Sequence, residues 1–348
     1  MKKANWVVVG SVLLVLLFLP FAGITNAQSP DLKRLYEAAK KEGRLVIHDG
    51  GTLEEIRPII NAFEQQFPGI KVEAICQPAP TIPTRIIAEA AAGKLSIDAA
   101  SQSVGGHLLN LIERGIVRKV DVTKVVKVEP ENIWMGGYLY VETSVVPVWG
   151  YNTDLVSPAD VPKTWEDLLH PKWKGKIYMS GFGNIHASMF FTRPEAEAVS
   201  YLKKFRPQNV VLKANPRATS NSIATGEAAI GETFTRVFIE YKQRGAPVDI
   251  APIGPQMYVP DGTCAMNGSP HPNAADLWVA WRQMPEGRAA SLKFAGEAPE
   301  FRCENCPSAQ WRCDKGIKIH PINSFEEARR RGEYEKKVQD LLGLTPGK

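Results

Sequence analysis

The sequence lacks the features that mark several large classes of protein. After its first 27 residues it has no apolar run long enough to cross a membrane. It has no low-complexity segment and no internal repeat, and its apolar content is an ordinary 44%, which argues against disorder. We therefore expect a soluble globular protein after removal of the N-terminal run. Its 348 residues fit two lobes of roughly 100–150 residues each.

A charge excess of one sign is also nearly absent. The chain has 42 Lys and Arg against 37 Asp and Glu, and two of the lysines lie in the first 27 residues. The remainder has 40 basic residues against 37 acidic ones, a net charge of +3. This excess is too small and too evenly spread to indicate a nucleic acid partner.

Sequence signatures of catalysis are missing as well. No HExxH zinc motif, GxSxG nucleophile elbow, phosphate-binding P-loop or dinucleotide-binding GxGxxG occurs, and the six histidines are scattered. No nucleophile and base stand at a catalytic spacing. We therefore predict a protein that is not an enzyme and uses no cofactor. The alternative is an exported enzyme, such as a hydrolase or a deaminase, on the same fold.

The first 27 residues have the pattern of a secretory signal peptide. Lys2 and Lys3 precede an apolar, uncharged stretch from Trp6 to Ala22, and Thr25-Asn26-Ala27 supplies small residues that a signal peptidase reads. We expect cleavage after Ala27 and a periplasmic location. An uncleaved membrane anchor is the alternative.

The odd number of cysteines leaves at least one thiol unpaired within a monomer. The five cysteines are Cys76, Cys264, Cys303, Cys306 and Cys313. The last three lack a fourth zinc ligand unless His320 supplies it, and in an oxidising compartment a local disulfide is favoured. The first two either pair across strands or stay buried and free, and the sequence does not choose between these possibilities.

From residue 31 onwards, the apolar pattern alternates between helix and strand. It predicts a helix over 31–42, a strand over 44–48, a helix that begins at Thr52 and a strand over 70–75. Glu55 stands where it completes a capping box with Thr52. Such a strand–helix–strand unit predicts a parallel sheet with a right-handed crossover.

The stretch from Val145 to Ser180 is the segment around which we expect the chain to be organised. Its apolar start predicts a buried strand, Thr164 and Asp167 are spaced to cap a short helix, and a new strand is expected over 176–179. We interpret this stretch as the place where the chain passes from one lobe into the other.

Five sequence blocks between about residues 31 and 290 carry information through their order and spacing: FEQQFPGIKVE, WGYNTDLV, TWEDLLHPKWKGKI, GEAAIGE and NGSPHPNAADLWVAW. Together they resemble the extracellular solute-binding proteins of bacterial ABC importers, and most closely the iron(III)-type branch of the two-lobed (type II) periplasmic binding proteins. The resemblance implies an α/β fold of two hinged lobes, each a mixed sheet flanked by helices. It also implies a ligand in the cleft between the lobes, a permease partner in the inner membrane and a monomer.

The resemblance also implies a discontinuous first lobe. The expected parts are the signal peptide at 1–27, a first lobe at 28–143 and 255–320, a second lobe at 144–254, and a C-terminal helix within 321–348. We expect this last helix to pack across both lobes.

In such a fold the ligand contacts helix N-termini and strand-end loops, where free backbone N–H groups favour anions. The candidates on such loops are Gly51, Thr52, Ser101, Ser103, Ser180, Ser188, Arg217, Thr233 and Arg236. The two arginines offer a planar fork for a carboxylate or phosphate. The alternatives are that Thr52 only caps its helix, that Ser101 and Ser103 only form turns, and that the arginines are ordinary surface residues.

The sequence departs from the family pattern in one segment that bears on the identity of the ligand. In iron-binding members the segment matching Gly231–Glu240 carries adjacent tyrosines as metal ligands, whereas here it reads GETFTRVFIE. We therefore expect a small, organic and anionic ligand and no bound metal, with ferric ion as the alternative. Glu232 offers a contact for a cationic ligand group, although a structural ion pair is the simpler interpretation.

Overall fold

The computed structural model describes residues 29–77 and 82–345. The predicted signal peptide and its cleavage site lie outside the described residues. Within the described ranges, none of the helices combines the length and the apolar character that a membrane crossing needs.

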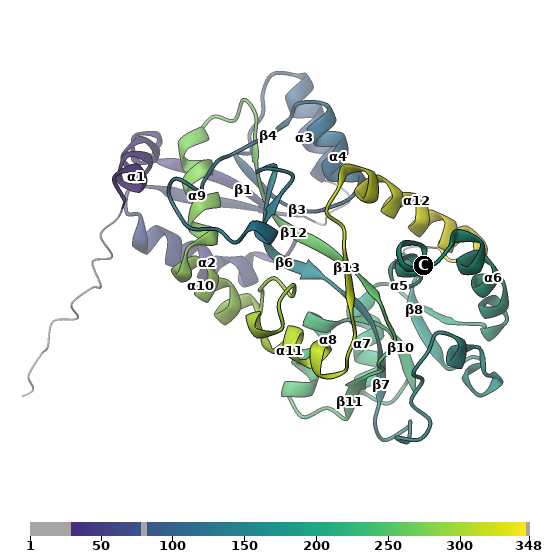
Figure 1. The fold of residues 1–348 in the computed structure, drawn as a ribbon. Helices are drawn as coiled ribbons and strands as arrows, with labels where there is room; N and C mark the ends of the chain where they lie inside the picture. Colours follow the sequence, from purple (N-terminus) through teal and green to yellow (C-terminus); the bar gives the residue numbers. More distant parts are fainter. Residues whose placement is uncertain (1–28, 78–81, 346–348) are drawn as a thin grey trace, which may run out of the picture.

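Two β-sheets lie side by side in an elongated molecule (Figure 1). The strands of the first sheet are β1 (Arg44–Asp49), β2 (Lys71–Cys76), β3 (Ala99–Ser103), β4 (Val117–Arg118), β5 (Ile133–Trp134), β6 (Leu139–Val145), β12 (Gln256–Met266) and β13 (Ile319–Pro321). Those of the second are β7 (Pro147–Asn152), β8 (Ile177–Ser180), β9 (Val211–Lys213), β10 (Ile230–Phe234) and β11 (Val248–Ile250). The strand orders are β2-β1-β3-β12-β6-β5, with β4 and β13 also pairing β12, and β11-β7-β10-β8-β9. This confirms the expected mixed α/β class.

Helices cover both faces of each sheet. Those beside the first sheet are α1 (Pro30–Glu42), α2 (Leu53–Gln66), α3 (Ile82–Ala91), α4 (Gly106–Glu113), α9 (Pro272–Gln283) and α10 (Pro285–Ala295). Those beside the second are α5 (Asn184–Thr192), α6 (Glu195–Phe205), α7 (Pro216–Ala224), α8 (Thr235–Gln243) and α11 (Pro307–Asp314). One apolar core lies on each face of each sheet, so each sheet with its helices forms one lobe.

The β1–α2–β2 unit forms as its local sequence predicts. β1 pairs in parallel with β2 and with β3. At the start of α2, the Glu55 backbone N–H donates to the Thr52 hydroxyl at 3.3 Å, and the Thr52 N–H donates to the Glu55 carboxylate at 2.9 Å. The helix turns its apolar stripe inward, with Ile59 and Phe63 fully buried. Capping and periodicity thus place the N-terminus of α2 at the strand-end edge of the first sheet.

Two short connections join the lobes. β6 ends at Val145 in the first sheet and β7 begins at Pro147 in the second. The return runs from the end of β11 at Ile250 to the start of β12 at Gln256. Both connections therefore pass between the two sheets, one from β6 to β7 and the other from β11 to β12.

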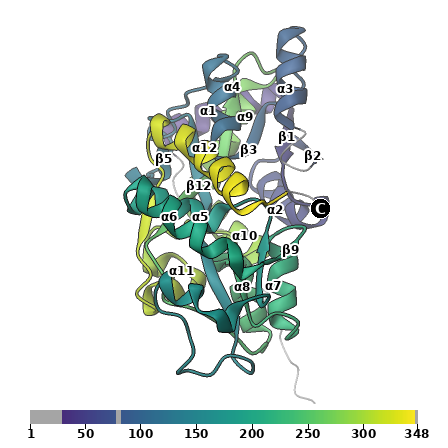
Figure 2. The same cartoon turned by 90° about the vertical axis from the view of Figure 1, so that its right-hand side faces the viewer.

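Another link between the lobes is α12 (Phe325–Leu342), which Figure 2 shows in yellow across both of them. Arg331 donates through Nη1 to the Val104 carbonyl of the first lobe at 2.6 Å. Gln339 donates through Nε2 to the Phe182 carbonyl of the second lobe at 3.1 Å. The helix therefore fastens one side of the molecule.

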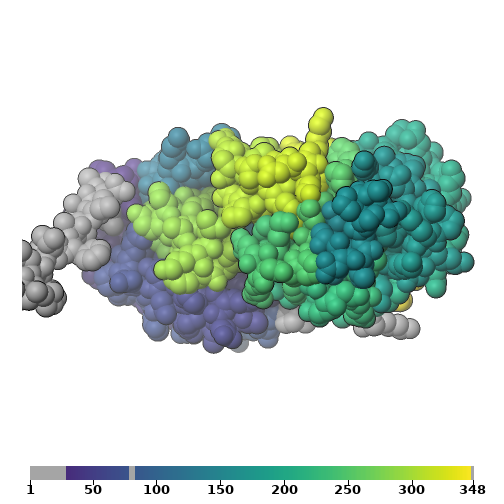
Figure 3. Space-filling model, turned by 90° about the horizontal axis from the view of Figure 1, so that it is seen from below, coloured from purple at the N-terminus to yellow at the C-terminus, as the bar shows by residue number. Residues whose placement is uncertain are grey.

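Residues 299–317, expected in the first lobe, pack against the second. The indole ring of Trp311 on α11 stacks on Phe238 of α8 with ring centroids 6.0 Å apart. Its Nε1 donates to Asp249 at 2.9 Å. Figure 3 shows this part of the chain in yellow-green between the two lobes.

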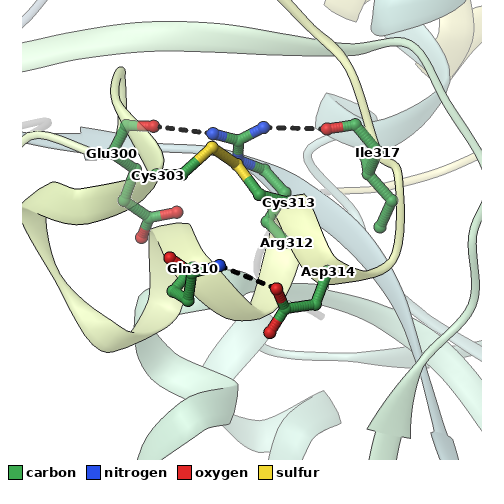
Figure 4. The surroundings of a disulfide bond; sticks show 7 residues. All are labelled: Glu300, Cys303, Gln310, Arg312, Cys313, Asp314 and Ile317. Atoms are coloured by element: carbon green, nitrogen blue, oxygen red, sulfur yellow. Dashed lines mark hydrogen bonds between the residues drawn. A yellow bond between two sulfur atoms is a disulfide. The ribbon is translucent and has the colours of Figure 1, made fainter.

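A disulfide between Cys303 and Cys313 closes this segment (Figure 4). Beneath it, Arg312 donates to the Ile317 carbonyl at 2.8 Å and to the Glu300 carbonyl at 3.0 Å. Cys306 is a free thiol, as are the other two cysteines. No cluster of His, Cys, Asp or Glu suited to a metal ion occurs in the described ranges. The local disulfide favoured from the spacing is thus confirmed.

Candidate ligand-binding cleft

A cavity of about 1240 Å³ lies between the two lobes. Its first-lobe side is formed by the β1–α2 loop, the facing parts of β3, β6 and β12, and the ends of α9 and α10. Its second-lobe side is formed by α7 and α8. We call these sides the first-lobe wall and the second-lobe wall.

The two walls carry opposite charge. The ionisable side chains of the first-lobe wall are Asp49, Glu55, Glu142, Asp261, Arg282 and Glu297. Those of the second-lobe wall are Arg217, Arg236, Glu240 and Arg244. The first wall therefore has an excess of carboxylates and the second an excess of guanidinium groups.

The deep part of the first-lobe wall is built around Arg282, which is buried. Its Nη2 lies 2.5 Å from Glu142 Oε2 and 3.7 Å from Glu297 Oε2. Burial raises the pKa of Glu297 to about 7, against the lowering influence of Arg236 and Arg282. Burial also raises the pKa of Asp261, although the Ser103 hydroxyl donates to it at 2.9 Å. These carboxyl groups therefore have less compensating positive charge than their burial requires.

The N-terminus of α2 borders the same cavity through Gly51 and Thr52. The Gly51 N–H donates to Asp49 Oδ1 at 2.8 Å, and Thr52 is engaged in its capping box with Glu55. Carboxylates of the chain itself thus already occupy part of the anion site expected at this helix end.

The second-lobe wall is more open. Arg217 of α7 and Arg244 after α8 both approach Glu240, at 3.3 Å and 3.9 Å. Arg236, in the first turn of α8, forms one ion pair with a described residue, Glu297, at 4.0 Å across the cleft. Its Nε has no hydrogen-bond partner among the described residues. This wall can therefore accept an acidic group from a ligand.

Over residues 58–302 the sequence matches the family model described as bacterial extracellular solute-binding protein. The chain belongs to this family. Solved structures with the same fold include iron-bound HitA from Pseudomonas aeruginosa, with 19% identity, a TM-score of 0.71 and coverage of 86% of this chain and 99% of that one. Another is AfuA from Actinobacillus pleuropneumoniae with fructose-6-phosphate, with 18% identity, a TM-score of 0.68 and coverage of 87% and 99%.

A curated relative, an uncharacterized protein of Haemophilus influenzae, is 28% identical over 155 residues. That match spans 42% of this chain and 45% of the relative, so the chain matches less than half of the relative's length. The resemblance to the extracellular solute-binding proteins is confirmed, and the two-lobed fold is shared with iron-bound HitA.

Five of the candidate residues of this solute-binding protein line the cleft, and they are Gly51, Thr52, Ser101, Arg217 and Arg236. Ser103 lies beside them as the donor to Asp261. The structure therefore brings together the candidates from the first-lobe loops and the two arginines of the second lobe.

The other three candidates lie inside the protein and do not line the cleft. Ser180 donates to Glu232, Ser188 accepts from the Met257 N–H at 3.0 Å, and Thr233 shares a hydrogen bond with the Ser220 hydroxyl at 2.5 Å. All three are fully buried, so their hydroxyls serve the interior.

Glu232 is likewise internal: it does not line the cleft, and within the part of the chain that the structure describes it has no ion pair. Its carboxylate accepts from the Ser180 hydroxyl at 2.7 Å and from the Ile185 N–H at 3.1 Å. Burial raises its pKa to about 7, because these neutral donors compensate only part of the desolvation.

Sequence reasoning missed most of the acidic wall. Glu142, Asp261 and Glu297 belong to no motif, and neither does Arg282 on α9. A β-strand that turns a single polar side chain toward a cleft leaves no periodic signal that distinguishes it from a surface residue.

Proposed function

We propose that this protein is the receptor of an ABC importer and captures a small organic solute with an acidic group between its lobes. It then delivers this solute to a permease in the inner membrane. The observation that carries the proposal is the cleft of about 1240 Å³ whose second-lobe wall presents three arginines. A periplasmic location follows from the extracellular character of the family.

The acidic group is supported by the arrangement of these arginines. Two of them, Arg217 and Arg244, share the single carboxylate of Glu240, and Arg236 has no close partner on its own lobe. A guanidinium group binds a carboxylate or a phosphate through two parallel hydrogen bonds. An acidic solute would therefore complete the coordination of this wall.

We expect the two lobes to close around the solute, because short connections join them. A solute that touches both walls gains contacts only when the lobes approach, and it shifts the population by its higher affinity for the closed form. We expect the permease to bind the closed form. This would prevent the empty receptor from competing for the transporter.

Ferric ion is the weaker alternative. No tyrosine is among the described residues that line the cavity, and hard Fe(III) favours phenolate and carboxylate oxygens. HitA was solved with iron and AfuA with fructose-6-phosphate on the same fold, so the fold does not fix the ligand.

A screen of the mature protein by thermal shift tests the proposal. The panel contains carboxylic acids, phosphonates, sugar phosphates, amino acids, polyamines and ferric salts. A ligand at 100 times its Kd stabilises the native state by about 2.7 kcal/mol and raises the Tm. Small-angle scattering on the best ligand should then show a smaller radius of gyration. Tight binding with an unchanged radius would contradict closure.

The variant Arg236→Ala should weaken binding of the acidic solute by about 10- to 100-fold, because it removes a charged hydrogen bond of about 1.5–3 kcal/mol. Calorimetry measures the affinity, and urea denaturation checks that the fold is intact. Arg34→Ala, an exposed position on α1, is the matched control. Equal affinity in both variants would remove Arg236 from the site.

A further inference from the structure

We propose that the solute is dipolar, with a protonated amine that faces the first-lobe wall and an acidic group that faces the second-lobe wall. This inference rests on the proposed function, since it names the chemical class of the solute held in the same cleft.

The charge on the two walls is the first observation. The first-lobe wall has five carboxylates and one guanidinium group, whereas the second-lobe wall has three guanidinium groups and one carboxylate. A solute with only an acidic group would balance the second wall and leave the first with its excess of negative charge. A solute with only amines would leave the arginines unbalanced.

Burial makes this imbalance costly. Glu142 engages Arg282 at 2.5 Å, so the guanidinium group is committed mainly to that carboxylate. Glu297 then lies 3.7 Å from Arg282 and 4.0 Å from Arg236, and Asp261 has the Ser103 hydroxyl as its donor. Closing the lobes removes further water from Asp261 and Glu297. A cationic ligand group placed between them would offset that loss.

Unpartnered groups in the same wall are the second, independent observation. Glu142 is 4% exposed and Thr143 5% exposed, and both line the cavity. Oε1 of Glu142 and the Thr143 hydroxyl have no hydrogen-bond partner among the described residues. Buried oxygens of this kind are rarely left unsatisfied, so they indicate a hydrogen-bond donor that the site is built to receive.

An amine fits this wall better than a metal ion. Within residues 29–77 and 82–345, no three side chains of His, Cys, Asp or Glu converge as a metal ion requires. An ammonium group donates three hydrogen bonds and can rotate them to suit carboxylates that do not converge on one point. Asp261 and Glu297 are the residues that we assign to it, and Arg236 is assigned to the acidic group.

The test compares matched compounds on the mature protein by calorimetry and thermal shift. Each set contains an amino acid, the same acid without its amine and the same amine without its acid. Examples are γ-aminobutyrate with butyrate and propylamine, and phenylalanine with 3-phenylpropionate and phenethylamine. We expect at least one amino acid to bind at least tenfold more tightly than both of its analogues.

Two variants assign the groups. Asp261→Asn should weaken the amino acid at least tenfold and leave its deaminated analogue unchanged, whereas a merely structural role would weaken both. Glu297→Gln repeats the test at the second carboxylate, and Arg34→Gln is the control.

The outcomes separate the two proposals. A deaminated acid that binds as tightly as its amino acid overturns the dipolar solute and leaves the receptor intact. A polyamine or a metal ion as the only ligand also overturns it. If no compound of the wider panel raises the Tm or compacts the protein, the proposed function itself is wrong.

Discussion

Arg282 and Arg217 face the same cleft from opposite sides, yet the side chain of Arg282 is 4% exposed and that of Arg217 is 56% exposed. The first is held in a buried network with Glu142 and Glu297, and the second projects from a helix toward solvent. The first-lobe wall therefore holds its arginine in place through buried contacts, whereas Arg217 of the second-lobe wall keeps most of its rotamer freedom in solvent. A side chain that is already ordered loses less entropy on binding than one that must be ordered by the ligand.

We expect the largest effect on stability from a substitution in the first-lobe wall. Arg282→Ala leaves Glu142 as a buried carboxylate without its cation, and loss of one partner of a buried ion pair costs about 3–5 kcal/mol. Urea denaturation of Arg282→Ala measures this loss in the free energy of unfolding. A decrease below about 1 kcal/mol would show that the first-lobe wall is not preorganised by this pair.

We expect an intermediate effect on stability from a second pair of residues, the buried glutamates Glu142 and Glu232. Glu142 has a cation beside it, whereas Glu232 in the second lobe has only neutral donors. The pKa of Glu232 is raised from 4.5 to about 7, so the folded state binds this proton more tightly than the unfolded state does. Its contribution to stability is fully present below about pH 4.5 and should be lost as the pH rises to about 7, a change of about 3 kcal/mol.

Glu232→Gln isolates this contribution, because other groups titrate in the same range. The difference in unfolding free energy between the parent protein and Glu232→Gln should change by about 3 kcal/mol between pH 4.5 and pH 7.5 and stay constant above. A difference that is independent of pH would show that Glu232 is ionised throughout.

We expect the smallest effect on stability from a substitution in the second-lobe wall. Arg244 is 75% exposed and its ion pair with Glu240 is 3.9 Å long. Arg244→Ala should therefore change the free energy of unfolding by less than about 0.5 kcal/mol, as is usual for exposed pairs. The same urea titration measures it. A loss above about 1 kcal/mol would remove the contrast between the walls.

The parts of the fold that were predictable are those whose signals are local. Thr52 and Glu55 are close in sequence, and so are the apolar residues of α2, so capping and periodicity define that helix without knowledge of the rest. Arg217 and Arg236 became candidates through the family resemblance, because it indicates which loops face the cleft and spacing alone does not. Arg244 was not among the candidates, although it lines the same cavity.

Part of the first-lobe wall lies on β12, a strand whose local sequence does not predict a strand. β12 contains Pro260, Asp261 and Gly262 in its middle, a combination typical of turns. Pairing with β3 and β6 on either side overrides that preference, and the register shifts between Asp261 and Gly262. At Gly262 an added Cβ would lie 1.9 Å from the Tyr140 carbonyl oxygen, so only glycine fits. Such an irregularity in a strand re-aims a side chain, and here Asp261 lines the cleft.

The position of β12 in the chain also has a consequence during synthesis. β12 joins β3 to β6 in the middle of the first sheet, but its residues, 256–266, come late in the sequence. Until the ribosome has made them, β3 and β6 lack the strand that joins them, so the first sheet cannot be completed. The first lobe therefore cannot finish folding before most of the second lobe has been synthesised.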